Sequence, residues 1–171
     1  MVLFANPTVT TMATGAVIAL FGEAMRFWGV AYAGSLTRVT GSVGAPEVVV
    51  AGPYAYMRNP LYVGNIMMYS GVGVMANAFS PWLVLAAFTY IAVQYSMIVS
   101  LEEEFLEEEF GGVYLQFKKE VPRFFPRFPP NRHPAQEHQK ADWSEAFRSE
   151  RRTFQAIVIM MVLLLAIWYW R

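Results

Sequence analysis

The sequence contains no cysteine and has few charged residues. Without cysteine among its 171 residues, the chain forms no disulfide, no thiolate metal site and no cysteine nucleophile. Only 15% of the residues are charged, whereas soluble domains average about 25%. Lysine plus arginine and aspartate plus glutamate number 13 each, so there is no electrostatic case for nucleic-acid binding. The N-terminus also lacks the basic segment of a cleaved signal peptide, so we expect the first apolar run to be retained.

Hydrophobic and aromatic residues are abundant instead. They make up 56% and 16% of the chain, and the mean hydropathy is +0.33. Long apolar runs in this background predict an all-α membrane protein with about four transmembrane helices, folded as one membrane domain over residues 1–171. The predicted spans are residues 10–32, 59–78, 81–101 and 153–170. A short amphipathic helix at residues 142–152 is expected on the membrane surface before the last span.

Small residues recur at every seventh position in the first two predicted spans. They are Gly15, Gly22 and Gly29 in the first span, and Gly64, Gly71 and Ala78 in the second. A stripe of small residues lets two membrane helices approach closely. The spacing therefore predicts that these two stripes pack against each other.

The segments between the spans differ in character. Residues Ala33 to Tyr56 contain Leu36, Val39, Val43 and Val48–Val50 broken by glycine and proline, which predicts a short hairpin or an extended loop. Asn77–Pro81 is a tight turn, so the second and third spans should form an antiparallel hairpin. The third helix is expected to continue to Phe110 and to end at Gly111–Gly112, before a short helix at Val113–Glu120.

Basic residues predict the orientation in the membrane. Arg38 and Arg58 lie in the first long connection, and nine more lie between Lys118 and Arg152. None lies before Arg26 or in the Asn77–Pro81 turn. The positive-inside rule then places both long polar segments in the cytoplasm, where they would form a cofactor-binding region of short helices and loops.

Two polar stretches on that side are candidates for a functional site. Gly52–Gly64 is an irregular segment that leads into a membrane helix, with Pro60 suited to the first helical position. Glu102 and Glu103 emerge directly from the third span, where a carboxylate is costly without a cation. Arg58 or a cationic ligand could supply that charge. We expect Glu107–Glu109 to be solvated.

Two further polar features have simpler interpretations. Glu23 and Arg26 are three residues apart in the first span and can pair on one helix face. His133 and His138 lie in a polar loop without partner ligands, whereas zinc needs three or four. No metal site is predicted.

The motifs carry a resemblance to a known family. They are Gly52-Pro53-Tyr54, Arg58-Asn59-Pro60-Leu61-Tyr62-Val63-Gly64, Leu101-Glu102-Glu103-Glu104-Phe105-Leu106, Phe110-Gly111 with Tyr114, and Val121-Pro122-Arg123. In order and spacing, this pattern resembles the isoprenylcysteine carboxyl methyltransferases and phospholipid N-methyltransferases, integral membrane enzymes. The resemblance covers about residues 45–126, the expected methyltransferase core. Asn59 stands where that family usually has histidine, which affects any role that needs an imidazole.

The resemblance implies an S-adenosylmethionine site facing the cytoplasm and a lipid-like or prenylated acceptor, methylated on oxygen or nitrogen, that arrives from the membrane lipids. Arg58 and Glu103 are the expected catalytic residues. The expected cofactor-binding residues are Tyr54, Arg58, Asn59, Pro60, Tyr62, Gly64, Glu102 and Glu103. Glu102 or Glu103 would take the cofactor's ammonium and Arg58 its carboxylate, with tyrosines beside the sulfonium. Arg123 would close the site.

Two other functions remain open at this point. A membrane reductase of the sterol-reductase type would need an NADPH site, and the sequence contains no nicotinamide-binding fingerprint. A non-enzymatic lipid-binding protein would leave the glutamates merely solvated. Binding of S-adenosylhomocysteine or of NADPH separates these hypotheses.

Overall fold

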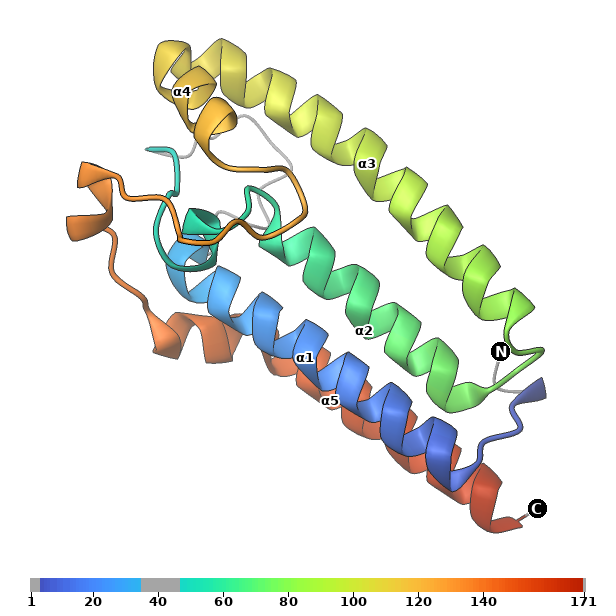
Figure 1. The fold of residues 1–171 in the computed structure, drawn as a ribbon. Helices are drawn as coiled ribbons and strands as arrows, with labels where there is room; N and C mark the ends of the chain where they lie inside the picture. The colour runs from blue at the N-terminus through green and yellow to red at the C-terminus, as the bar shows by residue number, and fades with distance from the viewer. Residues whose placement is uncertain (1–3, 35–46, 171) are drawn as a thin grey trace.

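The computed structural model describes residues 4–34 and 47–170, which form a bundle of helices (Figure 1). The elements are α1 (Val9–Ala33), η3 (Gly52–Ala55), α2 (Pro60–Ala76), α3 (Trp82–Phe110), α4 (Gly112–Glu120), η4 (Pro134–Glu137) and α5 (Trp143–Trp170). Neither described range contains a strand, which confirms the all-α prediction. Val48–Val50 has no regular secondary structure, and the rest of the predicted hairpin, with Leu36, Val39 and Val43, lies outside the described residues.

Within residues 4–34 and 47–170, three helices are long and apolar enough to cross a membrane. They are α1, α3 and α5, with 25, 29 and 28 residues. The fourth predicted span, α2, has 17 residues and is about 26 Å long, at the lower limit for a membrane-spanning helix. Figure 1 shows both termini at one end of the bundle, and the η3 and α4 regions at the other. The two polar segments therefore lie at the same end, as predicted.

The glycine stripes of α1 and α2 pack against each other. A Cβ atom on Gly22 would lie 2.6 Å from the Gly64 carbonyl oxygen, and one on Gly71 would lie 2.6 Å from the Gly15 oxygen. Such contacts leave room for hydrogen only, so the two backbones touch directly. This confirms the docking that the seven-residue spacing predicts.

The α2–α3 hairpin is also confirmed. Asn77 ends α2 in the left-handed conformation, with φ 47°, and its N–H donates to the carbonyls of Gly73 and Val74. Helix α3 then continues through its glutamates to Phe110. Gly111, with φ 52°, separates it from α4. This continuous helix carries Glu102 and Glu103 to the end of the bundle where the polar loops lie.

Helix α5 differs from the prediction. The expected surface helix at residues 142–152 and the span at 153–170 form one continuous helix, Trp143–Trp170. The prediction of a separate surface helix is wrong because no proline or glycine interrupts this region. Glu150 is also fully buried, where it accepts hydrogen bonds from Arg26 of α1. This interaction holds the first turns of α5 against the bundle.

Candidate functional site

Two loop segments form the floor of the candidate site. The backbone of residues 55–59 is hydrogen-bonded to residues 122–131, which follow α4. Arg58 N donates to Pro122 O at 2.9 Å, and Arg127 N donates to Tyr56 O at 3.0 Å. The stretch before α2 and the segment after α4 therefore form one unit, although α2, α3 and α4 separate them in sequence.

Glycine and proline shape the first of these segments. Gly52 has φ 61°, and a Cβ atom there would collide with the ring of Tyr32. Pro53 is the second residue of the short helix η3, and Pro60 occupies the first position of α2. These residues turn the chain sharply between the two helices and place Arg58 and Asn59 opposite the end of α3.

Arg58 and Glu103 form the centre of the site. Arg58 Nε lies 2.9 Å from Glu103 Oε1, and Arg58 Nη2 lies 3.3 Å from Oε2. Arg58 Nη1 donates to the carbonyls of Lys118 and Val121, at 3.0 and 2.5 Å. The two side chains are only 9% and 7% exposed. Arg58 thus ties α3, α4 and its own loop together through a two-pronged, charge-assisted contact.

Two more residues surround the Glu103 carboxylate. Asn59 Nδ2 lies 3.2 Å from Glu103 Oε1 and 3.3 Å from the carbonyl oxygen of Arg123. Arg123 Nε lies 3.4 Å from Glu103 Oε2. The structure therefore brings together Arg58, Asn59, Glu103 and Arg123, as the motifs predict. It leaves Glu103 with no free oxygen for a large ligand, because polar groups of the chain occupy both.

Glu102 has a different environment, because successive helical residues point about 100° apart. Its carboxylate is exposed, and its Oε1 accepts a hydrogen bond of 2.5 Å from the Tyr62 hydroxyl. The Tyr62 ring lies 4.9 Å from the Tyr95 ring, centroid to centroid. The second predicted carboxylate is thus accessible and contacts Tyr62, whose ring packs against Tyr95. Farther along α3, Glu107 contacts Lys118 of α4 and is only partly exposed. Glu108 and Glu109 are exposed, as expected.

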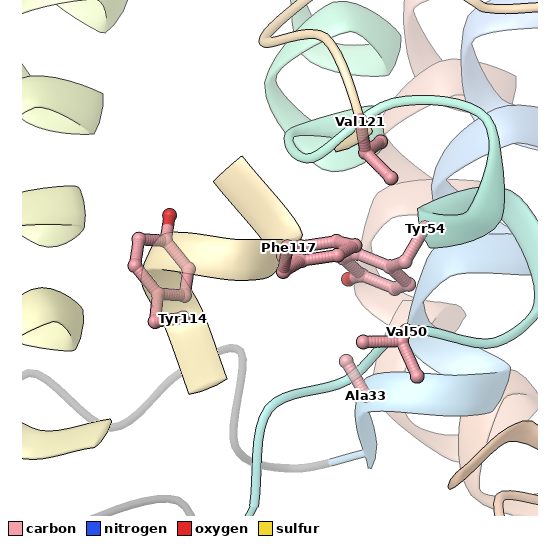
Figure 2. Packing of buried hydrophobic residues seen from close by; sticks show 6 residues of the cluster. All are labelled: Ala33, Val50, Tyr54, Tyr114, Phe117 and Val121. Carbon is pink, nitrogen blue, oxygen red and sulfur yellow. The ribbon is translucent and has the colours of Figure 1, made fainter. Parts of the chain in front are cut away.

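Tyr54 lies in an apolar cluster beside the site. The cluster consists of Ala33, Val50, Tyr54, Tyr114, Phe117 and Val121. Figure 2 shows Tyr54 and Phe117 with their rings close together, and the Tyr114 ring lies 6.1 Å from the Phe117 ring, centroid to centroid. Burial raises the pKa of Tyr54, and the Glu102 carboxylate raises it further, so its phenol stays neutral. Burial and Glu103 likewise raise the pKa of Tyr114.

Gly64 does not face these carboxylates. A Cβ atom at Gly64 would lie 2.7 Å from the Gly22 oxygen and 2.7 Å from Arg26 Cγ, so that side of α2 packs on α1. Pro60 is buried at the start of the same helix. The predicted site residues therefore divide into a group at the Glu102–Glu103 end of α3 and one glycine in the helix interface.

The structure contains a second buried polar centre, which the sequence predicts only in part. Arg26 Nη2 lies 2.9 and 2.8 Å from the Glu150 oxygens, and Arg26 Nη1 donates to Asn65. The predicted partner, Glu23, lies farther from Arg26, with Nε–Oε2 at 3.6 Å. The only sequence signal for Glu150 is an acidic residue close to the start of the last apolar run.

The histidines take no part in either centre. His133 Nδ1 accepts a hydrogen bond from Ala135 N at 3.2 Å and so caps η4. Within residues 4–34 and 47–170, no three side chains of histidine, aspartate or glutamate are grouped to hold a metal ion.

Comparison with known proteins gives one family. The sequence model described as "Phospholipid methyltransferase" matches residues 10–112. No solved structure matches.

Curated relatives have similar sequences over part of their length. Over 116 residues, or 66% of this chain and 39% of the relative, the chain is 32% identical to a protein-S-isoprenylcysteine O-methyltransferase of Xenopus laevis. It is 34% identical over 80 residues to the cobalt-zinc-cadmium resistance protein CzcN of Cupriavidus metallidurans, and 34% identical over 81 residues to the nickel-cobalt-cadmium resistance protein NccN of Alcaligenes xylosoxydans xylosoxydans. These two matches cover 36% and 37% of the relatives, so the chain aligns with little more than a third of each.

Proposed function

The chain belongs to the phospholipid methyltransferase family, and from this premise we propose that it transfers a methyl group from S-adenosylmethionine to a lipid-like or prenylated acceptor. One observation carries the proposal. The loop with Arg58 and Asn59 is bonded to Glu103, while the neighbouring Glu102 is left exposed beside Tyr62. Such a site has a rigid floor and one accessible carboxylate.

Glu102 and the neighbouring tyrosines fit the positive groups of this cofactor. S-adenosylmethionine carries an ammonium and a sulfonium, and an exposed carboxylate binds the first through charge-assisted hydrogen bonds. The rings of Tyr62 and Tyr95 offer aromatic faces to a cation nearby. Glu102 Oε1 already accepts from Tyr62, while Oε2 has no partner among the described residues. Oε2 is therefore the atom that we assign to the ammonium.

Arg58, Asn59 and Glu103 have a positioning role in this proposal. Their polar atoms are committed to one another and to the carbonyls of Lys118, Val121 and Arg123. When bound, S-adenosylmethionine supplies an electrophilic methyl group, and its transfer requires in-line alignment of acceptor, methyl carbon and sulfur. The contacts between α3 and the loop before α2 fix the position of Glu102 relative to Tyr62. They therefore help to hold the bound cofactor in line with the acceptor.

The acceptor determines whether proton transfer is needed. A carboxylate or thiolate acceptor attacks without losing a proton, whereas an amine must release one. Water at the exposed side of the site is then the available proton acceptor, because both oxygens of Glu103 face donors and those of Glu102 are assigned to Tyr62 and to the cofactor's ammonium. Asn59 cannot take a proton as an imidazole would.

Calorimetric titration of the purified protein with S-adenosylhomocysteine, the product of the cofactor, tests the proposal. We expect Glu102→Gln to weaken binding about tenfold or more, because a charge-assisted contact of roughly 1.5–3 kcal/mol is lost. Glu109→Gln changes the same charge at an exposed position of α3 and should bind as the wild type does. If the wild-type protein binds NADPH and not S-adenosylhomocysteine, the reductase hypothesis replaces ours.

A second measurement concerns the acceptor. A membrane lipid extract is incubated with the protein and with S-adenosylmethionine labelled in its methyl group. A labelled lipid identifies the acceptor. If no product is labelled but S-adenosylhomocysteine still binds, the result contradicts only the assignment of a lipid-like acceptor. Absence of both contradicts the enzyme assignment and supports a lipid-binding protein.

A further inference from the structure

An open groove runs along one side of α3 and ends beside the candidate site. Its wall is formed by Phe88, Thr89, Ala92, Val93, Ser96 and Ser100, and Arg123 stands at its end. Phe88 and Ser100 are 12 residues apart, which makes the groove about 18 Å long. One leaflet is half of a hydrocarbon core of about 30 Å, and the groove is slightly longer than one leaflet is deep.

The wall of this groove is largely apolar, and two of its three hydroxyls bond within α3. The Thr89 hydroxyl donates to the Leu85 carbonyl at 2.8 Å, and the Ser100 hydroxyl donates to the Ser96 carbonyl at 2.9 Å. Hydroxyls that bond to their own helix need no ligand. The exposed side of the groove carries Val93 and Met97, which are 56% and 65% exposed. An aliphatic chain is the kind of ligand that fits such a wall.

Arg123 gives the groove one positive end. Its side chain is 31% exposed, its Nε lies 3.4 Å from Glu103, and its Nη2 donates to Ser100 Oγ at 2.8 Å. Its Nη1 has no hydrogen-bond partner among the described residues, in contrast to Arg58, whose Nη1 bonds to two carbonyls. A guanidinium that is anchored on one side and open on the other is suited to an oxyanion.

We propose that the α3 groove binds the methyl acceptor, an amphiphile with an aliphatic chain along Phe88–Ser100 and an anionic group on Arg123. The inference rests on the proposed function, because it assigns the acceptor to the side of α3 that leads to the Arg58–Glu103 centre. Charge complementarity selects the occupant: a carboxylate or phosphate makes a charge-assisted contact with the open Nη1 of Arg123, which a neutral chain cannot make.

Photolabelling tests this assignment in the full-length protein. The protein is incubated in neutral detergent with palmitic acid that carries a diazirine in its chain, is irradiated, and is digested for peptide mapping by mass spectrometry. We expect labels to concentrate on residues 88–100. Lysophosphatidic acid, which has one chain and a phosphate, should compete, and uncharged monopalmitoyl glycerol should not.

Two variants separate the headgroup contact from the chain contact. Arg123→Gln should reduce labelling of residues 88–100 about tenfold, because a charge-assisted contact is lost. Ala92→Trp fills the groove without touching Arg123 and should abolish labelling there even if Arg123→Gln fails to fold. Arg152→Gln removes an exposed arginine from α5 and is the matched control, with labelling unchanged.

S-adenosylhomocysteine binding is measured on the same preparations, so that failure of this inference is distinct from failure of the proposed function. Wild-type affinity should persist in Ala92→Trp. Labels spread evenly over lipid-facing helices and insensitive to both variants would overturn the inference, since they indicate general lipid contact. Loss of S-adenosylhomocysteine binding in Arg123→Gln with unchanged labelling would also overturn it, because Arg123 would then bind the cofactor's carboxylate.

Discussion

Two arginine–glutamate pairs, Arg58–Glu103 and Arg26–Glu150, have nearly the same local chemistry in different surroundings. In each pair, one guanidinium contacts both oxygens of a carboxylate that is at most 7% exposed. Arg26–Glu150 joins α1 to α5 inside the bundle. Arg58–Glu103 joins a loop to the end of α3 and adjoins the exposed Glu102. A buried ion pair is therefore insufficient to mark a site in this molecule.

The difference lies in what borders each pair. Arg26 is enclosed by helix packing, including the Gly22–Gly64 contact, and its third partner is Asn65 of α2. Arg58 is held by backbone carbonyls of an irregular segment, where Arg123 and Glu102 still present polar atoms to a ligand. Irregular backbone at the end of a membrane bundle needs such internal partners. The first pair stabilises the scaffold, and the second stabilises a segment that a ligand can reach.

Removing either arginine should have the largest effect on stability. Arg58→Ala and Arg26→Ala each remove the guanidinium that contacts both oxygens of a buried carboxylate, which costs about 3–5 kcal/mol in the free energy of unfolding. Unfolding in mixed detergent micelles, followed by tryptophan fluorescence, measures this cost. The two variants should be similarly unstable.

The conservative variants then distinguish the two pairs by ligand affinity. Arg58→Lys keeps the charge but loses the two-pronged contact, so the Kd for S-adenosylhomocysteine should rise about tenfold. Arg26→Lys should leave that Kd nearly unchanged at temperatures where the protein stays folded. Equal effects of both lysine variants on the Kd would contradict the division into scaffold and site.

Asn59 should show the next largest effect. Asn59→Ala removes a hydrogen bond to the buried, charged Glu103, which is worth about 1.5–3 kcal/mol. We expect the loss both in unfolding free energy and in S-adenosylhomocysteine affinity. Asn59→His restores an N–H donor and should recover part of it. If histidine and alanine behave alike, the donor is not what this position contributes.

Gly64 lies in the predicted cofactor motif, but its contacts are with helix α1. A substitution at Gly64 therefore tests whether this residue serves the cofactor site or the helix packing. Gly64→Ala places a methyl group 2.7 Å from the Gly22 oxygen and from Arg26 Cγ. Overpacking of this kind costs about 1–3 kcal/mol of stability, without a specific loss of S-adenosylhomocysteine affinity. Gly112→Ala is the control, since nothing lies within 4 Å of its added methyl group. A large affinity loss in Gly64→Ala alone would assign this glycine to the cofactor.

The smallest effect is expected at the exposed end of the site. Tyr62→Phe removes the hydroxyl that donates to Glu102, a contact worth about 0.5–1.5 kcal/mol. S-adenosylhomocysteine affinity should fall a few-fold while the unfolding free energy changes little. Tyr90→Phe alters a tyrosine that is 69% exposed on α3 and should have no effect. A large loss of stability in Tyr62→Phe would make its hydroxyl part of the scaffold.

Local patterns predict much of the fold. Spacing of seven residues correctly pairs the glycines of α1 and α2, because helix periodicity brings such residues onto one face. The helix bounds of α1 and the end of α3 at Gly111 agree within one or two residues. The Arg58–Glu103 ion pair is also predictable, because a carboxylate close to the membrane is costly without a cation and Arg58 lies at the same end of the hairpin.

Long-range partners are what the sequence does not reveal. Nothing near Glu150 indicates that it binds Arg26, which lies 124 positions earlier, so the start of α5 is easily mistaken for a surface helix. The contacts of Arg123 are equally hard to predict from the sequence. Its motif suggests proximity to the site, but the Ser100 contact and the open Nη1 depend on the path of the chain after α4.

The pairing of residues 55–59 with residues 122–131 has a consequence for synthesis of the protein. The Arg58 motif emerges from the ribosome well before Lys118 and Val121, whose carbonyls it needs. A nascent chain that stops at residue 112, where the family match ends, carries both motifs but lacks these acceptors. The site is therefore completed only after the α2–α3 hairpin is made. A truncated chain would contain Arg58 and Glu103 but not the segment after α4 whose carbonyls hold Arg58 in place.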